Sequence, residues 1–191
     1  MTIGLFGGSF DPIHHGHLIV AQAVVEALGL EQLRFLPARE QPFKVGRHLA
    51  PPELRARMVA LAIAGEPRFA LERAELERPG PSYTVDTLRY LREREPDRRF
   101  ALLIGADAAR ELPEWREAGA LPALAELVVF TRAGSEVPEL PWPVQVVPVP
   151  AVGISATEVR RRVALGRSIR YWVPDAVGEA IRAAGLYLPD A

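Results

Sequence analysis

The residues best suited to chemistry in this sequence are two histidines three positions apart, His14 and His17. They follow a short apolar stretch and the pair Gly7 and Gly8, and they open a segment with helical periodicity. This spacing puts both imidazoles on one face of a helical turn, and Gly16 leaves that face open. The glycine pair permits close approach of the backbone to a ligand and positive φ angles.

Two imidazoles beside a helix N-terminus favour a phosphate as the ligand, because the helix dipole and the free N–H groups attract anions. A zinc site would want a third protein ligand, and the sequence holds no cysteine to supply one. We therefore predict a phosphate site and no resident metal at His14 and His17. The alternative is that both histidines only cap the helix.

A second anion site is predicted at Ser155, Thr157 and Arg160, near the C-terminus. Ser155 and Glu158 alone would form a capping box, which is the purely structural interpretation. Thr157 and Arg160, however, share one face of the first helical turn. A hydroxyl, free backbone donors and a guanidinium then converge, and this suits the β- and γ-phosphates of ATP.

Composition limits the class of protein. A chain of 191 residues with 49% hydrophobic residues and no cysteine fits one globular domain and excludes disulfide frameworks and thiol nucleophiles. The net charge of −1 gives no reason to expect nucleic acid or a membrane as partner. The sequence has no apolar run of about 18 residues and no basic N-terminal region, so we expect a cytoplasmic protein.

Lysine occurs once, at Lys44, whereas the other 22 of the 23 cationic residues are arginine. Asparagine is absent and there are 18 prolines. Heat adaptation and GC-rich codon usage both explain this bias, and the sequence does not separate them.

Strand and helix patterns alternate from end to end. We expect strands at residues 2–6, 33–36, 69–71, 100–104, 127–131 and 144–149. We expect helices at residues 17–28, 53–64, 157–165 and 174–184, and Gly65 should end the second of these. A further helix should begin at a cap, Ser82 or Thr84, and run to residue 94. The alternation predicts an α/β fold with a mostly parallel sheet covered on both faces, whose ligands bind at the carboxyl ends of the strands. Residues 39–52 are expected to form an exposed loop.

Both motifs carry a family resemblance. Gly8 through His17 resembles the G-x-F-x-P-x-H-x-G-H signature of the nucleotidyltransferase superfamily, and Ile154 through Arg160 resembles its I-S-S-T-x-x-R signature, with Ala156 in place of the second serine. The resemblance implies a Rossmann-like, doubly wound single domain over residues 1–191, with a C-terminal helical part from about 154. It also implies that the ATP-binding residues include Gly8, Ser9, Phe10, His14, His17, Ser155, Thr157 and Arg160.

Further segments resemble the bacterial nicotinate-nucleotide adenylyltransferases. Residues 82–88 resemble the S-Y-T-x-D-T-L helix start, in which backbone N–H groups hold the carboxylate of nicotinate mononucleotide. Residues 104–107 with Trp115 resemble the G-x-D and the downstream tryptophan, and residues 41–44 loosely resemble P-P-H-K, with Phe43 in place of histidine. The resemblance implies ATP contacts at Gly105 and Asp107, and acceptor contacts at Lys44, Tyr83, Thr84, Trp115 and Arg132. For Trp115 the alternative is plain core packing.

The implied reaction is adenylyl transfer from ATP to nicotinate mononucleotide, which gives nicotinate adenine dinucleotide and pyrophosphate in NAD biosynthesis. His14, His17 and Arg160 are the expected catalytic residues, and Mg²⁺ is expected to arrive with ATP. The alternatives are a sister enzyme using nicotinamide mononucleotide or pantetheine phosphate, a non-catalytic ATP sensor, and an RNA-binding module. Whether the chain forms a homo-oligomer stays open.

Overall fold

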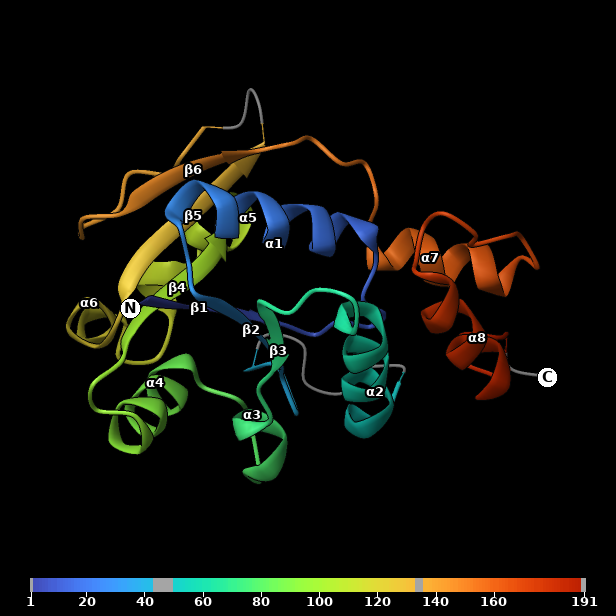
Figure 1. Cartoon of the computed structure of the whole chain (residues 1–191), viewed down its shortest axis with the longest axis horizontal. Coiled ribbons are helices and arrows are strands. Elements are labelled where there is room, and N and C mark those ends of the chain that lie inside the picture. Colours follow the sequence, from blue (N-terminus) through green and yellow to red (C-terminus); the bar gives the residue numbers. More distant parts are fainter. Residues whose placement is uncertain (1, 43–49, 133–135, 190–191) are drawn as a thin grey trace.

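The computed structural model describes residues 2–42, 50–132 and 136–189. Its centre is a six-stranded sheet, in the order β3-β2-β1-β4-β5-β6, in which every neighbouring pair is parallel (Figure 1). This order, with helices on both faces, is the doubly wound α/β arrangement that the sequence predicted. The strands are β1 (Thr2–Gly8), β2 (Gln32–Pro37), β3 (Phe69–Leu71), β4 (Arg99–Gly105), β5 (Glu126–Arg132) and β6 (Gln145–Val149).

Alternate strand residues supply two separate hydrophobic cores, one on each face of the sheet. On β1, Phe6 faces α1 (His15–Leu28) and α2 (Pro52–Ile63), whereas Leu5 faces α4 (Thr84–Arg94) and α6 (Leu121–Leu124). On β4, Leu103 belongs to the same core as Phe6, and Leu102 belongs to the same core as Leu5. Short elements complete the layers: α3 (Ala74–Glu77), α5 (Ala106–Ala109), η2 (Leu112–Glu114) and η3 (Ala118–Ala120).

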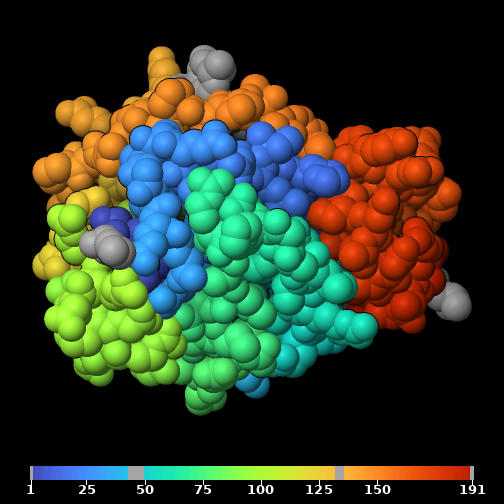
Figure 2. Space-filling model, in the orientation of Figure 1, coloured from blue at the N-terminus to red at the C-terminus, as the bar shows by residue number. Residues whose placement is uncertain are grey.

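The C-terminal part consists of α7 (Ala156–Ala164) and α8 (Asp175–Ala183). In the space-filling view it lies, in red, against α1 and α2 (Figure 2). Val159 and Ile181 from this part belong to the same buried cluster as Phe6. Among the described residues, no helix is both long and apolar enough to cross a bilayer.

Most expected elements are confirmed to within one or two residues, but two capping predictions are wrong. Tyr83, rather than Ser82 or Thr84, is the N-cap of α4, because the Ser82 hydroxyl instead accepts from the Arg39 N–H at 3.0 Å. The residue after α2 is Ala64 in a right-handed conformation, so Gly65 is not the stop. In contrast, Gly29 ends α1 with φ 58°, as predicted.

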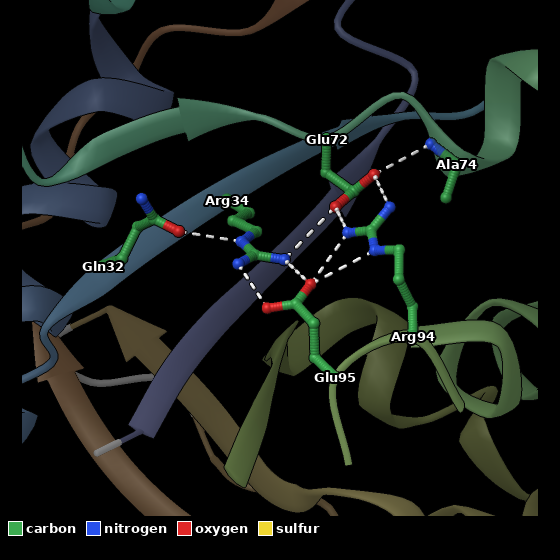
Figure 3. A network of polar contacts seen from close by, with 6 residues as sticks. All are labelled: Gln32, Arg34, Glu72, Ala74, Arg94 and Glu95. Carbon is green, nitrogen blue, oxygen red and sulfur yellow. Dashed lines mark hydrogen bonds and ion pairs between the residues drawn. The ribbon is translucent and has the colours of Figure 1, made fainter. Parts of the chain in front are cut away.

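A partly buried ion-pair network fixes the far end of α4 to the sheet (Figure 3). Arg34 on β2 contacts Glu95 with two nitrogens, at 2.6 and 2.8 Å, and Arg94 contacts Glu72 after β3. Hydrogen bonds from Arg34, and then from Arg94, hold the pKa of Glu95 at about 2. The network therefore stabilises the position of α4, whose other end reaches the candidate site.

Candidate active site

A cavity of about 1000 Å³ opens at the carboxyl ends of β1, β4 and β5. Ligands of doubly wound folds bind at this edge, and the volume lies at the upper end of the range for small-molecule pockets. The lining includes twelve of the fifteen residues that the sequence singled out: Gly8, Ser9, Phe10, His14, His17, Tyr83, Thr84, Gly105, Trp115, Ser155, Thr157 and Arg160. The two motifs, far apart in the chain, thus face one space.

The two histidines stack on one another at the start of α1, with ring centroids 3.7 Å apart. The main-chain N–H of His14 donates to Nδ1 of His17 at 3.2 Å. A neutral His17 must therefore carry its proton on Nε2, where it is a hydrogen-bond donor. Burial, together with the neighbouring His14, lowers the pKa of His17 well below its ordinary value, so this side chain is neutral at pH 7.

The capping part of the alternative is confirmed, because His14 and His17 form a capping box at the start of α1. His17 does accept a main-chain hydrogen bond at the helix start, through Nδ1. That contact also orients the ring and fixes its tautomer, because the remaining nitrogen has to be the donor. Phe10 packs edge-on against the His17 ring, with centroids 5.1 Å apart.

At Gly8 and Gly16, close neighbours rather than backbone freedom favour glycine. A Cβ at Gly16 would lie 3.0 Å from Nδ1 of His14 and 3.4 Å from the Ile154 carbonyl oxygen. A Cβ at Gly8 would lie 3.1 Å from the Phe10 ring. Neither glycine of the pair adopts the positive φ that it permits, because both continue β1; the residue in the turn with positive φ is Phe10, at 47°.

The second motif forms as predicted, with one difference. The Ser155 hydroxyl accepts from the Glu158 N–H at 3.2 Å, but the Glu158 carboxylate pairs with Arg161 and does not close a capping box. Arg160 donates to the Asp11 carbonyl at 2.7 Å and to the Thr157 hydroxyl at 3.2 Å. This guanidinium therefore joins the connection from the end of β1 into the start of α1, residues 8–16, to the start of α7. We call residues 8–16 the glycine turn.

The other wall of the cavity is built by the start of α4 and by Trp115. Trp115 also packs against the core beneath α4, so its binding and packing interpretations are compatible. Arg116 lies over the Tyr83 ring at 4.6 Å and lines the cavity as well. Arg116 was not predicted from the sequence. It directly follows Trp115, the expected stacking residue, and a cation in that position indicates a second contact to an anionic ligand.

Three predicted residues are not placed with the rest. The Asp107 side chain is 92% exposed, does not line the cavity and contacts Arg110 at 3.2 Å. Lys44, like Phe43, lies outside the described residues, as does the side chain of Arg132. Their roles stay predictions.

Comparison with known proteins bears on this geometry. A cytidylyltransferase-like family model matches residues 5–162. A Thermus thermophilus protein named probable nicotinate-nucleotide adenylyltransferase is 51% identical over 187 residues, which is 98% of this chain and all of the relative. A Roseiflexus relative of the same name is 45% identical and covers 97% of each chain. The chain belongs to the nicotinate-nucleotide adenylyltransferase family.

Membership of this family confirms that the chain is an enzyme of the nucleotidyltransferase class. The fold agrees with that of a Plasmodium falciparum nicotinic acid mononucleotide adenylyltransferase solved with NaAD, at a TM-score of 0.82 and 20% identity over 97% of both chains. At this identity the likeness shows the fold alone.

Proposed function

We propose that this enzyme transfers the adenylyl group of ATP to nicotinate mononucleotide, giving nicotinate adenine dinucleotide and pyrophosphate in NAD biosynthesis. One observation carries the proposal: a single cavity joins the two histidines and Arg160 to the N-terminus of α4 beside Trp115. The first group suits a triphosphate, and the second suits a planar aromatic acid.

The chemistry requires little from the protein beyond alignment and charge stabilisation. The acceptor phosphate attacks the α-phosphorus of ATP, a new P–O bond forms, and the bond to the bridging oxygen of the pyrophosphate breaks. A phosphate monoester has a second pKa of about 6, so the nucleophile is largely ionised at pH 7 and needs no general base. The enzyme must hold two anions in line and neutralise the leaving group.

The ATP side divides between the two motifs. His17 donates through Nε2 to an α-phosphate oxygen, and His14 stacks beside it and contacts the same phosphate. Ser155, Thr157 and Arg160 hold the β- and γ-phosphates at the start of α7, where free backbone N–H groups add to the attraction. Gly8, Ser9 and Phe10 approach the triphosphate, Gly105 approaches the nucleoside, and the Ala156 position offers only its backbone donor. Asp107 is assigned to the ATP side on the sequence alone.

The acceptor side uses a helix N-terminus without a side-chain cap. Tyr83 is the N-cap of α4, which begins at Thr84, and the Tyr83 side chain makes no capping hydrogen bond. The backbone N–H groups there receive the nicotinate carboxylate, and Trp115 stacks on the pyridine ring. Lys44 and Arg132 are assigned to the acceptor on the sequence alone.

Mg²⁺ fits this site as a companion of ATP. Within residues 2–42, 50–132 and 136–189, no group of three or more histidine, aspartate or glutamate side chains is placed to hold a metal ion. Triphosphate oxygens are the ligands that this hard cation prefers, and bound there it neutralises charge that develops on the pyrophosphate. We expect activity to be lost in EDTA and restored by added Mg²⁺.

Pyrophosphate release with a panel of acceptors tests the proposal. With Mg²⁺ and ATP, we expect nicotinate mononucleotide to give the highest kcat/KM, ahead of nicotinamide mononucleotide and pantetheine phosphate. A preference for either of the latter two would overturn the acceptor assignment. Failure to release pyrophosphate with any acceptor, despite ATP binding, would instead favour a nucleotide sensor.

A further inference from the structure

Arg55 on α2 is a fully buried arginine that lies behind the cavity, outside its lining. Its guanidinium donates three hydrogen bonds to main-chain carbonyls, to Ser9 at 2.7 Å, Arg39 at 3.0 Å and Ala50 at 3.1 Å. Burial lowers the pKa of Arg55 from its ordinary value, and the Asp11 carboxylate opposes that shift. Burying a guanidinium is unfavourable unless its donors are satisfied, and here they connect three separate segments.

One of these segments, residues 39–41, follows the carboxyl end of β2 and runs between the two sides of the site; we call it the strut. Arg55 holds the Arg39 carbonyl of the strut and the Ser9 carbonyl of the glycine turn with one guanidinium. The Ser9 hydroxyl also donates to Oε1 of Gln41 at 2.7 Å. The strut is thereby fixed to the ATP side of the cavity at two points.

The other side of the strut is fixed to the start of α4. The Arg39 N–H donates to the Ser82 hydroxyl at 3.0 Å, and the Ser82 N–H donates to the Glu40 carbonyl at 2.8 Å. Ser82 directly precedes Tyr83, the N-cap of the helix that faces the acceptor. A continuous chain of hydrogen bonds therefore runs from the glycine turn, through Arg55 and the strut, to the acceptor wall.

We infer that Arg55 is a positioning residue that, through the strut, sets the distance between bound ATP and the bound acceptor. The inference rests on the proposed function, because it takes the glycine turn as the ATP side and α4 as the acceptor side. In-line transfer between two bound phosphates is sensitive to their separation, and a misplacement of about 1 Å lowers the rate about 100-fold. Each substrate alone contacts only one side, so its own affinity does not depend on the alignment.

The test separates binding from chemistry in Arg55→Met, which keeps much of the side-chain volume but removes the donors. We expect the single-turnover rate of pyrophosphate formation to fall about 100-fold. The dissociation constants for a non-hydrolysable ATP analogue and for nicotinate mononucleotide, measured separately by calorimetry, should stay within about threefold. Equal losses in rate and in both affinities, following the folded fraction, would show a merely structural role and overturn the inference.

Ser82→Ala is the second variant, because Arg55→Met removes a donor from each of three carbonyls and risks unfolding. Ser82→Ala removes the hydroxyl that accepts from Arg39, and we expect a loss of about tenfold in rate with both affinities kept. If Arg55→Met folds, the double variant should lose less than the product of the single losses, because both act through the strut. A wild-type single-turnover rate in Ser82→Ala would overturn the inference even if Arg55→Met does not fold.

Two controls lie on the same helix. Arg57→Met makes the same chemical change at an exposed position and should leave rate and affinities unchanged. Met58→Ala removes a buried side chain that takes no part in the strut. It should lower the melting temperature, but it should not lower the single-turnover rate while leaving both dissociation constants unchanged. Lack of reaction in the wild-type enzyme itself would count against the proposed function, not against the positioning role.

Discussion

The neutral state of His17 leads to a prediction about which replacements preserve catalysis. His17→Phe keeps a ring beside Phe10 but removes the Nε2 donor, whereas His17→Gln keeps an uncharged N–H donor of similar reach. Loss of one preorganised donor to a developing anion typically lowers kcat by about 100- to 1000-fold, or about 3–4 kcal/mol. We therefore expect His17→Phe in that range and His17→Gln to be closer to wild type. Rapid-quench measurement of pyrophosphate with both substrates saturating gives these rates directly.

The pH dependence of the wild-type rate tests the same reasoning without a mutation. Because burial and His14 lower the pKa of His17 well below 6.5, the ring stays neutral as the pH falls through that value. The acceptor phosphate, with a second pKa of about 6, lowers the rate by its own protonation in this range. Beyond that fall, single-turnover rates should show no further change that reports a histidine of ordinary pKa. At more acidic pH, protonation breaks the contact from the His14 N–H to Nδ1, and the rate should fall. A rate that rises as the pH drops through 6.5 would refute the neutral-donor role. So would a further variant, His17→Lys, if it were faster than His17→Gln.

The same pKa shift predicts how stability depends on pH. The unfolded chain binds a proton at His17 near pH 6.5, whereas the folded protein resists protonation until a lower pH. The contribution of His17 to the free energy of unfolding is therefore complete above pH 6.5 and is lost as the pH falls toward the folded pKa. Urea titrations should show less of this loss in His17→Phe than in the wild type.

Three further perturbations test other parts of the structure. Gly16→Ala places a methyl 3.0 Å from the His14 ring and should slow single turnover about tenfold. Its melting temperature should hardly fall, because alanine favours the helix over glycine by about 1 kcal/mol. Tyr187→Phe removes a hydroxyl that donates at 2.7 Å to a buried carboxylate, and should lower the free energy of unfolding by about 1–3 kcal/mol in urea titrations; Tyr171→Phe, at a 77% exposed residue, should not. Because the pKa of Glu95 is about 2 in the folded protein against its ordinary 4.5, its ion pairs stabilise fully above about pH 4.5 and are lost toward pH 2. Glu95→Gln should thus be about 2 kcal/mol less stable at pH 7 and match the wild type near pH 2; a gap that persists at acidic pH would contradict the ion-pair account.

Much of the fold follows from local sequence. Apolar β-branched runs and helical periodicity located the strands and the longer helices, and Gly29 and Ser155 cap their helices as expected. The wrong cap at α4 arises from a partner that is distant in sequence. Ser82 is bound to Arg39, and so it does not cap α4. Short-range spacing carries no information about such a contact.

The sequence by itself determined the chemistry on offer: two imidazoles at one helix start, a hydroxyl and a guanidinium at another, and no thiol. These follow from residue type and from spacing over three or four positions, which local helix geometry converts into shared faces. Only the tertiary structure decided that Arg160 reaches the Asp11 carbonyl and that Arg55 joins the glycine turn to the strut. It also decided that Asp107 points to solvent and that His17 is neutral. The physical reason is that burial and long-range hydrogen bonds depend on how the sheet and its two helical layers pack.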